Sequence, residues 1–337
     1  MSKRILAAAC AAATALALSA CSSAPSSEGN ASKEGTLTVM ASFYPLQYLA
    51  EKIGGEHVTV TSLTPAGAEP HDLELSPKTV DALASADAVV YLAGFQAAVD
   101  EAIEQQAPTT VIDVSPAVEL VEANSSANHP SEDEDADEAQ SGESTTEEHA
   151  DHDHEGNDHE GHHHDMSADP HFWLDPVRMA SAATLVGDKL AEADPANADT
   201  YKANAQALNE ELSALGDDLV AKTATCQIKT FVTAHTAFGY LADRTGLTQV
   251  GISGLDPDSS PSPARLAEIS QIAKDQGVTT IFTEALIDPK VAQTLADDLG
   301  ISTAVLDPIE SQTDSSKDYA AVMKDNINAL TTANNCQ

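Results

Sequence analysis

Basic and aromatic residues are scarce in this chain of 337 residues. Lys and Arg total 16 against 54 Asp and Glu, which gives a formal net charge of −38 with histidine neutral. Because phosphate contacts need Lys and Arg, this balance argues against a nucleic-acid partner and against a polybasic membrane patch. Six Phe, six Tyr and one Trp are too few for a surface that stacks on bases. The ligands that such a charge favours are cations.

Long apolar runs are absent except at residues 5–18, near the N-terminus. This run is too short to span a membrane comfortably, follows two basic residues and ends in Leu-Ser-Ala-Cys21. The arrangement is typical of a secretory signal and resembles the bacterial lipobox, which implies diacylglycerol on the sulfur of Cys21. A plain signal peptide with a chance cysteine is the alternative. We expect a lipoprotein signal peptide at 1–20, a flexible tether at 21–35 and an extracytoplasmic protein that lipid alone holds to the cell membrane, at the cell surface or the periplasmic face.

Cysteine is also rare, with four residues in the whole chain. Cys10 leaves with the signal peptide, and Cys21 carries the lipid. The remaining pair, Cys226 and Cys336, lies in an oxidising compartment, so a disulfide is expected. It would close a loop of about 110 residues, which the chain-entropy model values at about 4–5 kcal/mol. Two free thiols are the alternative, and the lack of CxxC spacing argues against zinc binding by this pair.

Short β-branched runs alternate with helical stretches from residue 36 onward, the pattern of βαβ units in parallel sheets. The expected strands lie at 36–42, 57–62, 87–92, 110–113, 229–234, 249–252, 279–283 and 301–306. The expected helices lie at 44–53, 76–84, 95–105, 177–193, 194–221, 237–245, 262–276, 289–299 and 316–333. The helix at 194–221 carries apolar residues at alternating spacings of four and three, which marks one continuous apolar stripe.

This α/β pattern predicts two parallel-sheet lobes joined by a helical spine. The expected parts are an N-terminal lobe at 36–168, linking helices at 169–223 and a C-terminal lobe at 224–337. The segment 122–168 interrupts the first lobe. Between residues 129 and 165 it has 15 acidic residues, 8 His and no Lys or Arg, so it cannot bury a core and is expected to be a disordered loop. Its imidazoles and carboxylates could collect zinc weakly; an acidic solvated spacer is the alternative.

Three histidines outside this loop share a structural context. His71 lies in the loop after the strand at 57–62, His171 lies in Asp-Pro-His-Phe-Trp, and His235 follows a strand directly. Asp307 follows the last predicted strand. Ligands of open α/β sheets bind beyond the carboxyl ends of the strands, so these four groups could converge in a cleft between the lobes. Three imidazoles and one carboxylate form a four-ligand set for zinc. Taken singly, a His at a strand end is more often a satisfied loop or core residue than a ligand.

Four segments of the chain carry a second, more specific signal. They are Glu69-Pro-His-Asp-Leu-Glu-Leu-Ser-Pro77, Asp169-Pro-His-Phe-Trp-Leu-Asp-Pro176, Thr233-Ala-His-Thr-Ala-Phe-Gly-Tyr-Leu-Ala242 and Phe282-Thr-Glu284. In this order they resemble the cluster A-I metal-binding proteins, extracytoplasmic lipoproteins that deliver zinc or manganese to ABC importers. The resemblance covers about 36–337. It implies two α/β lobes joined by a rigid helix, with the metal in the cleft between them.

The same resemblance implies a ligand set. The family's three imidazole positions and one carboxylate position fall on His71, His171, His235 and Asp307. Glu69 and Glu284 are candidate supporting or substitute ligands. Manganese members of the family place a carboxylate where this chain has His235, so zinc is expected; manganese or iron is the alternative.

Together these features predict a protein that captures Zn²⁺ outside the cytoplasm and delivers it to an ABC permease and its ATPase. We expect a monomer without enzymatic activity. A surface-anchored zinc hydrolase is one rival, but the chain has no HExxH motif and the expected ligands leave no open coordination position. A surface adhesin with incidental metal binding is the other rival.

Overall fold

The computed structural model describes residues 35–122 and 168–337. The predicted signal peptide, the lipidation site Cys21, nearly all of the predicted tether and the interior of the acidic loop lie outside the described residues. Among the helices of the described ranges, none combines the length and the apolar character that crossing a bilayer requires.

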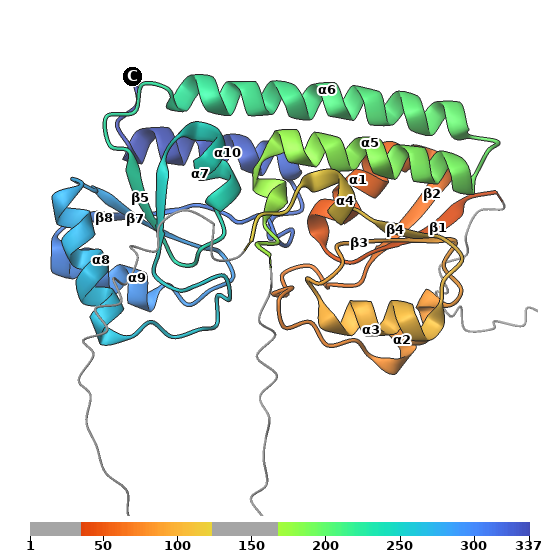
Figure 1. Cartoon of the computed structure of the whole chain (residues 1–337), viewed down its shortest axis with the longest axis horizontal. Helices are drawn as coiled ribbons and strands as arrows, with labels where there is room; N and C mark the ends of the chain where they lie inside the picture. Colours follow the sequence, from red (N-terminus) through yellow and green to blue (C-terminus); the bar gives the residue numbers. More distant parts are fainter. Residues whose placement is uncertain (1–34, 123–167) are drawn as a thin grey trace, which may run out of the picture.

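The first lobe is a four-stranded parallel sheet in the order β2-β1-β3-β4 (Figure 1). Its strands are β1 (Leu37–Ala41), β2 (Val58–Ser62), β3 (Ala88–Tyr91) and β4 (Val111–Asp113). Its helices are α1 (Tyr44–Gly54), α2 (Pro77–Leu83), α3 (Ala97–Gln106) and the short α4 (Ser115–Val118). Side chains alternate between the two faces of a strand. Accordingly Val39 and Ala41 pack with α1, whereas Met40 packs with α2 and α3.

The second lobe repeats this strand order as β6-β5-β7-β8, again all parallel. Its strands are β5 (Thr230–Thr233), β6 (Thr248–Gly251), β7 (Thr280–Thr283) and β8 (Ser302–Val305). Its helices are α7 (Gly239–Thr245), α8 (Pro263–Asp275), α9 (Lys290–Leu299) and α10 (Tyr319–Ala333). One face of the sheet packs on α8 and α9 and the other joins the large core shared with the first lobe.

Two long helices, α5 (Pro176–Ala193) and α6 (Ala198–Thr223), connect the lobes (Figure 1). At about 1.5 Å per residue, the 26 residues of α6 span about 39 Å, long enough to run past both sheets. The predicted apolar stripe of α6 is buried throughout, at Tyr201, Ala205, Leu208, Leu212, Leu215 and Leu219. The predicted two-lobe α/β architecture with a helical spine is confirmed.

The structure corrects several predicted boundaries. Helix α6 begins at Ala198 rather than at 194, because the carboxylate of Asp194 accepts hydrogen bonds from Asn197 and Tyr201 and closes a turn before the helix. Helix α10 begins at Tyr319 rather than at 316, with the Asp318 side chain accepting from the Ala321 N–H at its start. The one-turn helix α4 was not expected from the sequence.

The predicted disulfide between Cys226 and Cys336 is present. It joins the segment that follows α6 to the end of the chain beyond α10, next to main-chain hydrogen bonds from Gln227 and Ile228 to the same terminal segment. The C-terminal helix is therefore fixed to the base of the second lobe.

The close approach of α5 and α6 depends on the small residue Gly187. A Cβ atom there would lie 2.3 Å from the Cβ of Ala205 on α6, closer than real Cβ contacts. We therefore expect Gly187→Val to lower the free energy of unfolding by about 1–3 kcal/mol, because the helices must separate. Chemical denaturation measures this. Asp188→Val introduces the same side chain at the adjacent exposed position and should change stability by less than about 0.5 kcal/mol; equal losses in both variants would contradict the packing argument.

Candidate metal centre

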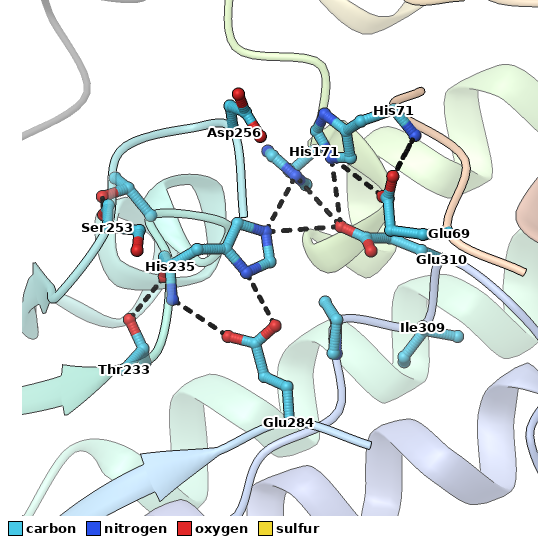
Figure 2. Close-up of polar contacts among 12 residues, drawn as sticks. Glu69, His71, His171, Thr233, His235, Ser253, Asp256, Glu284, Ile309 and Glu310 are labelled. Atoms are coloured by element: carbon cyan, nitrogen blue, oxygen red, sulfur yellow. Dashed lines mark hydrogen bonds and ion pairs between the residues drawn. The ribbon is translucent and has the colours of Figure 1, made fainter. Parts of the chain in front are cut away.

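Three imidazoles and one carboxylate meet at one point between the lobes (Figure 2). Ligand atoms of His71, His171, His235 and Glu310 all lie within 4.8 Å of one another. One carboxylate oxygen, Glu310 Oε1, is 3.4 Å from His71 Nε2, 3.2 Å from His171 Nε2 and 3.4 Å from His235 Nε2. The Nε2 atoms of His171 and His235 are 3.4 Å apart. Ligands about 2.0–2.1 Å from a tetrahedral ion lie about 3.3 Å from each other, so these distances fit a single zinc-sized cation.

The four side chains come from loops at the carboxyl ends of both sheets and from the start of the spine. His71 follows β2, His235 follows β5 and Glu310 follows β8, while His171 immediately precedes a short 3-10 helix (Phe172–Leu174) that leads into α5. The side chain of His71 is 6% exposed, and those of the other three are 0–3% exposed. The structure thus brings together the three predicted histidines, which are separated in sequence and were linked only by fold and resemblance.

The carboxylate in this group is not the predicted one. Asp307 is occupied elsewhere: its Oδ1 accepts from the Ile309 N–H at 2.8 Å, and its main-chain N–H and C=O both bond to the Asn326 side chain. Ile309 has a left-handed backbone conformation (φ 57°), which β-branched residues rarely adopt. Glu310 directly follows this residue, and its carboxylate faces the imidazoles (Figure 2). The structure therefore brings Glu310, and not Asp307, together with the three imidazoles.

Carboxylates also contact the Nδ1 atoms of two imidazoles, on the side of the ring away from Glu310. Asp169 Oδ1 is 2.8 Å from His171 Nδ1, and Glu284 Oε2 is 2.6 Å from His235 Nδ1. Such partners fix the ring orientation and leave Nε2 facing the metal position. Glu284, expected as a supporting or substitute ligand, thus lies behind His235 and outside the four-atom group, and its other oxygen accepts from the His235 N–H at 3.1 Å.

Glu69 has a different position from Glu284. Its carboxylate accepts from the His71 N–H at 2.9 and 3.0 Å and from the Asp72 N–H at 3.2 Å. Its Oε1 also lies 4.0 Å from His71 Nε2. In this arrangement it orders the loop of His71 and is not a member of the four-atom group.

The charges in the cluster shift the pKa values of its members. Burial alone would lower the pKa of His235, but Glu284 and Glu310 outweigh burial and raise that pKa to about 10. Burial likewise opposes protonation of His171, and Asp169 and Glu310 again raise its pKa. Burial would raise the pKa of Glu310, yet hydrogen bonds from the three imidazoles hold it well below its ordinary value. In the metal-free protein His235 therefore carries a proton at neutral pH, which a bound cation must displace.

Residues 39–333 match the family described as ZnuA, the periplasmic component A of a zinc-uptake complex. The chain belongs to the ZnuA family. This confirms the resemblance that the four sequence segments indicate. The description of that family names a component of a zinc-uptake complex and no enzyme.

Individual relatives agree with the family assignment. The chain is 34% identical over 324 residues to the "High-affinity zinc uptake system protein ZnuA" of Bacillus subtilis, covering 94% of this chain and 93% of that protein. It is 33% identical over 312 residues to the "Zinc-binding protein AdcA" of Streptococcus pyogenes, covering 88% of this chain. The chain spans about half, 56%, of the length of that streptococcal protein.

Solved structures match the same fold. The laminin-binding protein Lmb of Streptococcus agalactiae, titled a bifunctional protein with adhesin and metal transporting activity, superposes with a TM-score of 0.72 at 28% identity. The match covers 88% of this chain and 99% of that one. The fold of this solved structure thus matches most of the chain.

Replacing each of the two loop carboxylates by its amide tests which of them belongs to the site. We expect Glu310→Gln to weaken zinc binding by about tenfold or more, since changing even a supporting residue of a metal site typically costs 10–100-fold. Asp307→Asn removes a charge three residues away and should change the affinity by less than about threefold. Competition with a chelator of known affinity measures both. A larger loss in the Asp307 variant would restore the original sequence-based assignment.

The raised histidine pKa values predict a pH-dependent stability of the metal-free protein. A histidine whose folded pKa exceeds its unfolded value of about 6.5 stabilises the fold fully below that value, and this contribution is lost as pH rises through the folded pKa. For His235 the loss should extend from about pH 6.5 to about pH 10. We expect the stability difference between wild type and His235→Gln, measured by urea unfolding, to narrow across this interval, and zinc affinity to rise. A constant difference would contradict the assigned protonation.

Proposed function

We propose that this protein captures Zn²⁺ outside the cytoplasm and delivers it to the permease and ATPase of an ABC importer. The observation that carries the proposal is the set of four donor atoms at the spacing of a tetrahedral ion. Membership of the ZnuA family supports it, as do the names of the B. subtilis and S. pyogenes relatives, both of which refer to zinc.

The donor chemistry favours zinc over manganese or iron. Three imidazole nitrogens and a single carboxylate suit zinc, which binds nitrogen readily and is commonly four-coordinate in proteins. Manganese favours more oxygen ligands. The same four donors leave no open position for a substrate, as a catalytic zinc requires. The site is therefore suited to holding a cation as cargo.

The distribution of the donors suits release as well as capture. His71 belongs to the first lobe, His235 and Glu310 belong to the second, and His171 lies at the start of the spine. A small separation of the lobes would break the donor set. Helix α6 spans both lobes and limits that movement, so we propose that the opening is small and that the permease induces it.

The attachment to the membrane and the oligomeric state complete the proposal. A lipid on Cys21 would hold the protein, as a monomer, on the outer face of the cell membrane. The Leu-Ser-Ala-Cys21 sequence supports this proposal.

Adhesion is the second candidate function, because the S. agalactiae neighbour is titled an adhesin as well as a metal transporter. Adhesion to laminin that is independent of zinc loading would favour it.

Calorimetric titration of the dialysed full chain tests zinc capture. We expect one tight zinc site, distinguishable from any weaker binding elsewhere in the chain, and no tight manganese site. His71→Ala combined with His235→Ala should abolish the tight site while leaving the weak binding unchanged. If the double variant retained the tight site, the four-donor cluster would not be the place of capture.

A further inference from the structure

Two buried glutamines, one in each lobe, make the same pair of contacts beside the metal centre. Gln96 Nε2 donates to Thr64 Oγ1 and to the Pro70 carbonyl, both at 3.0 Å. Gln249 Nε2 donates to Thr233 Oγ1 at 2.8 Å and to the His235 carbonyl at 3.0 Å. Each glutamine is 2% exposed. Each amide therefore bonds a threonine and a main-chain carbonyl in or next to a metal-ligating residue.

The orientation of both amides follows from the hydroxyls that they contact. The Thr64 hydroxyl donates its proton to the Ser42 carbonyl at 2.7 Å, and the Thr233 hydroxyl donates to the His235 carbonyl at 2.6 Å. With these protons committed, each threonine oxygen can only accept, and so can each carbonyl. The amide nitrogen is the group that satisfies them, and the glutamine oxygens have no partner within the described part of the chain. A glutamate could not replace either glutamine, because it would present an acceptor to two acceptors.

The shared pattern does not follow from the repeated sheet topology. Gln96 directly precedes α3, after the third strand of its lobe, whereas Gln249 lies within β6, the edge strand of the other. Thr64 follows β2, and Thr233 ends β5. Equivalent contacts thus arise from non-equivalent positions. What the two sites have in common is that each adjoins a loop that carries a metal-binding histidine. This indicates that the contact holds that loop in place.

The two histidines depend on these contacts to different degrees. The ring of His235 is also held by Glu284 at Nδ1, and its N–H is held by the same carboxylate. For His71, the described residues provide no carboxylate at Nδ1. Its ring packs edge-to-face on Phe95, and its main chain is held by Glu69 on its N–H and by Gln96 on the preceding carbonyl. Loss of the glutamine contact should therefore displace His71 more than His235.

We propose that Gln96 and Gln249 are positioning residues that hold His71 and His235 at the metal point before the ion arrives, with Gln96 having the larger effect. The proposal rests on the proposed zinc-binding function and adds to it the residues that set affinity and release rate. It concerns preorganisation: a ligand loop that must be ordered on binding lowers the affinity by the cost of that ordering. Removing the amide donor should therefore weaken binding and speed the loss of zinc without removing any ligand.

The test compares Gln96→Met and Gln249→Met with a matched control in the full-length protein. Methionine keeps the length of the side chain and removes the donor. The control is Asn334→Leu, because Asn334 is also 2% exposed and its Nδ2 also donates to a carbonyl, that of Ile228 at 2.9 Å, but it lies at the end of α10. For each variant we would measure the zinc Kd by chelator competition, the zinc dissociation rate, the visible spectrum with Co²⁺ as probe, and the Tm without metal.

We expect Gln96→Met to raise the zinc Kd about 10–100-fold, the range typical of groups that orient a ligand, and to alter the Co²⁺ spectrum. Gln249→Met should raise it by less than about tenfold. Asn334→Leu should lower Tm but leave the Kd within about twofold of wild type and the Co²⁺ spectrum unchanged. If Gln96→Met fails to fold, Thr64→Val removes the hydroxyl that fixes the amide and should weaken zinc binding a few-fold.

Three results would overturn the inference. One is a wild-type Kd and Co²⁺ spectrum in Gln96→Met. Another is a loss of affinity that tracks Tm across all three variants, the control included, which would mark a purely structural role. A larger effect at Gln249 than at Gln96 would refute the asymmetry. Wild-type protein without a tight zinc site would overturn the proposed function as well, so the two failures are distinguishable.

Discussion

The rest of the site depends on the interaction of the buried Glu310 carboxylate with the three imidazoles that enclose it. A charged group without partners could not remain in this position, because removing an ion from water is costly unless charges and hydrogen bonds compensate. In the metal-free protein the compensation comes from protons on the imidazoles, which Asp169 and Glu284 stabilise in turn. A cation can take over this role. Protons and metal therefore compete for one set of atoms, and the supporting carboxylates determine how strongly each is held.

The fold supplies the geometry that this competition needs. Both lobes have the same parallel strand order, so each directs the carboxyl ends of its strands toward loops that can carry ligands. The spine limits the separation of the lobes, and its helices α5 and α6 pack closely enough to require Gly187. It also provides His171, whose neighbour Trp173 is fully buried and donates to the Pro308 carbonyl at 2.8 Å, next to the loop of Glu310. Through Trp173, the segment that begins the spine is thus hydrogen-bonded to the second lobe as well.

Much of this arrangement could be predicted from the sequence, and the limits have physical causes. The alternation of short apolar strands with capped helices is a local signal, and it predicts the two lobes. The spacing of apolar residues, also local, predicts the apolar stripe of α6. The three histidines could be singled out because each follows a predicted strand or lies within a recognisable motif. Glu310 could not, because its placement depends on the left-handed conformation of Ile309 and on Asn326 binding the main chain of Asp307. Asp307 directly follows the predicted strand at 301–306, and this is the position that the sequence pattern favours.

The buried amides mark a second limit of sequence-based prediction. Gln96 and Gln249 belong to no motif, and nothing in their local sequence distinguishes them from surface glutamines. Their role depends on contacts with residues 32 and 16 positions away, respectively, which only the folded chain brings together. The ligands of a site can thus be read from strand ends and motifs, whereas the groups that hold those ligands are set by tertiary packing. Under the proposed function zinc is bound tightly and still released, and the groups proposed to hold the ligands would set how firmly each donor stays at the metal point. The donor set is held unevenly, with His171 and His235 fixed through their rings and His71 mainly through its loop, so one donor is easier to displace than the other two.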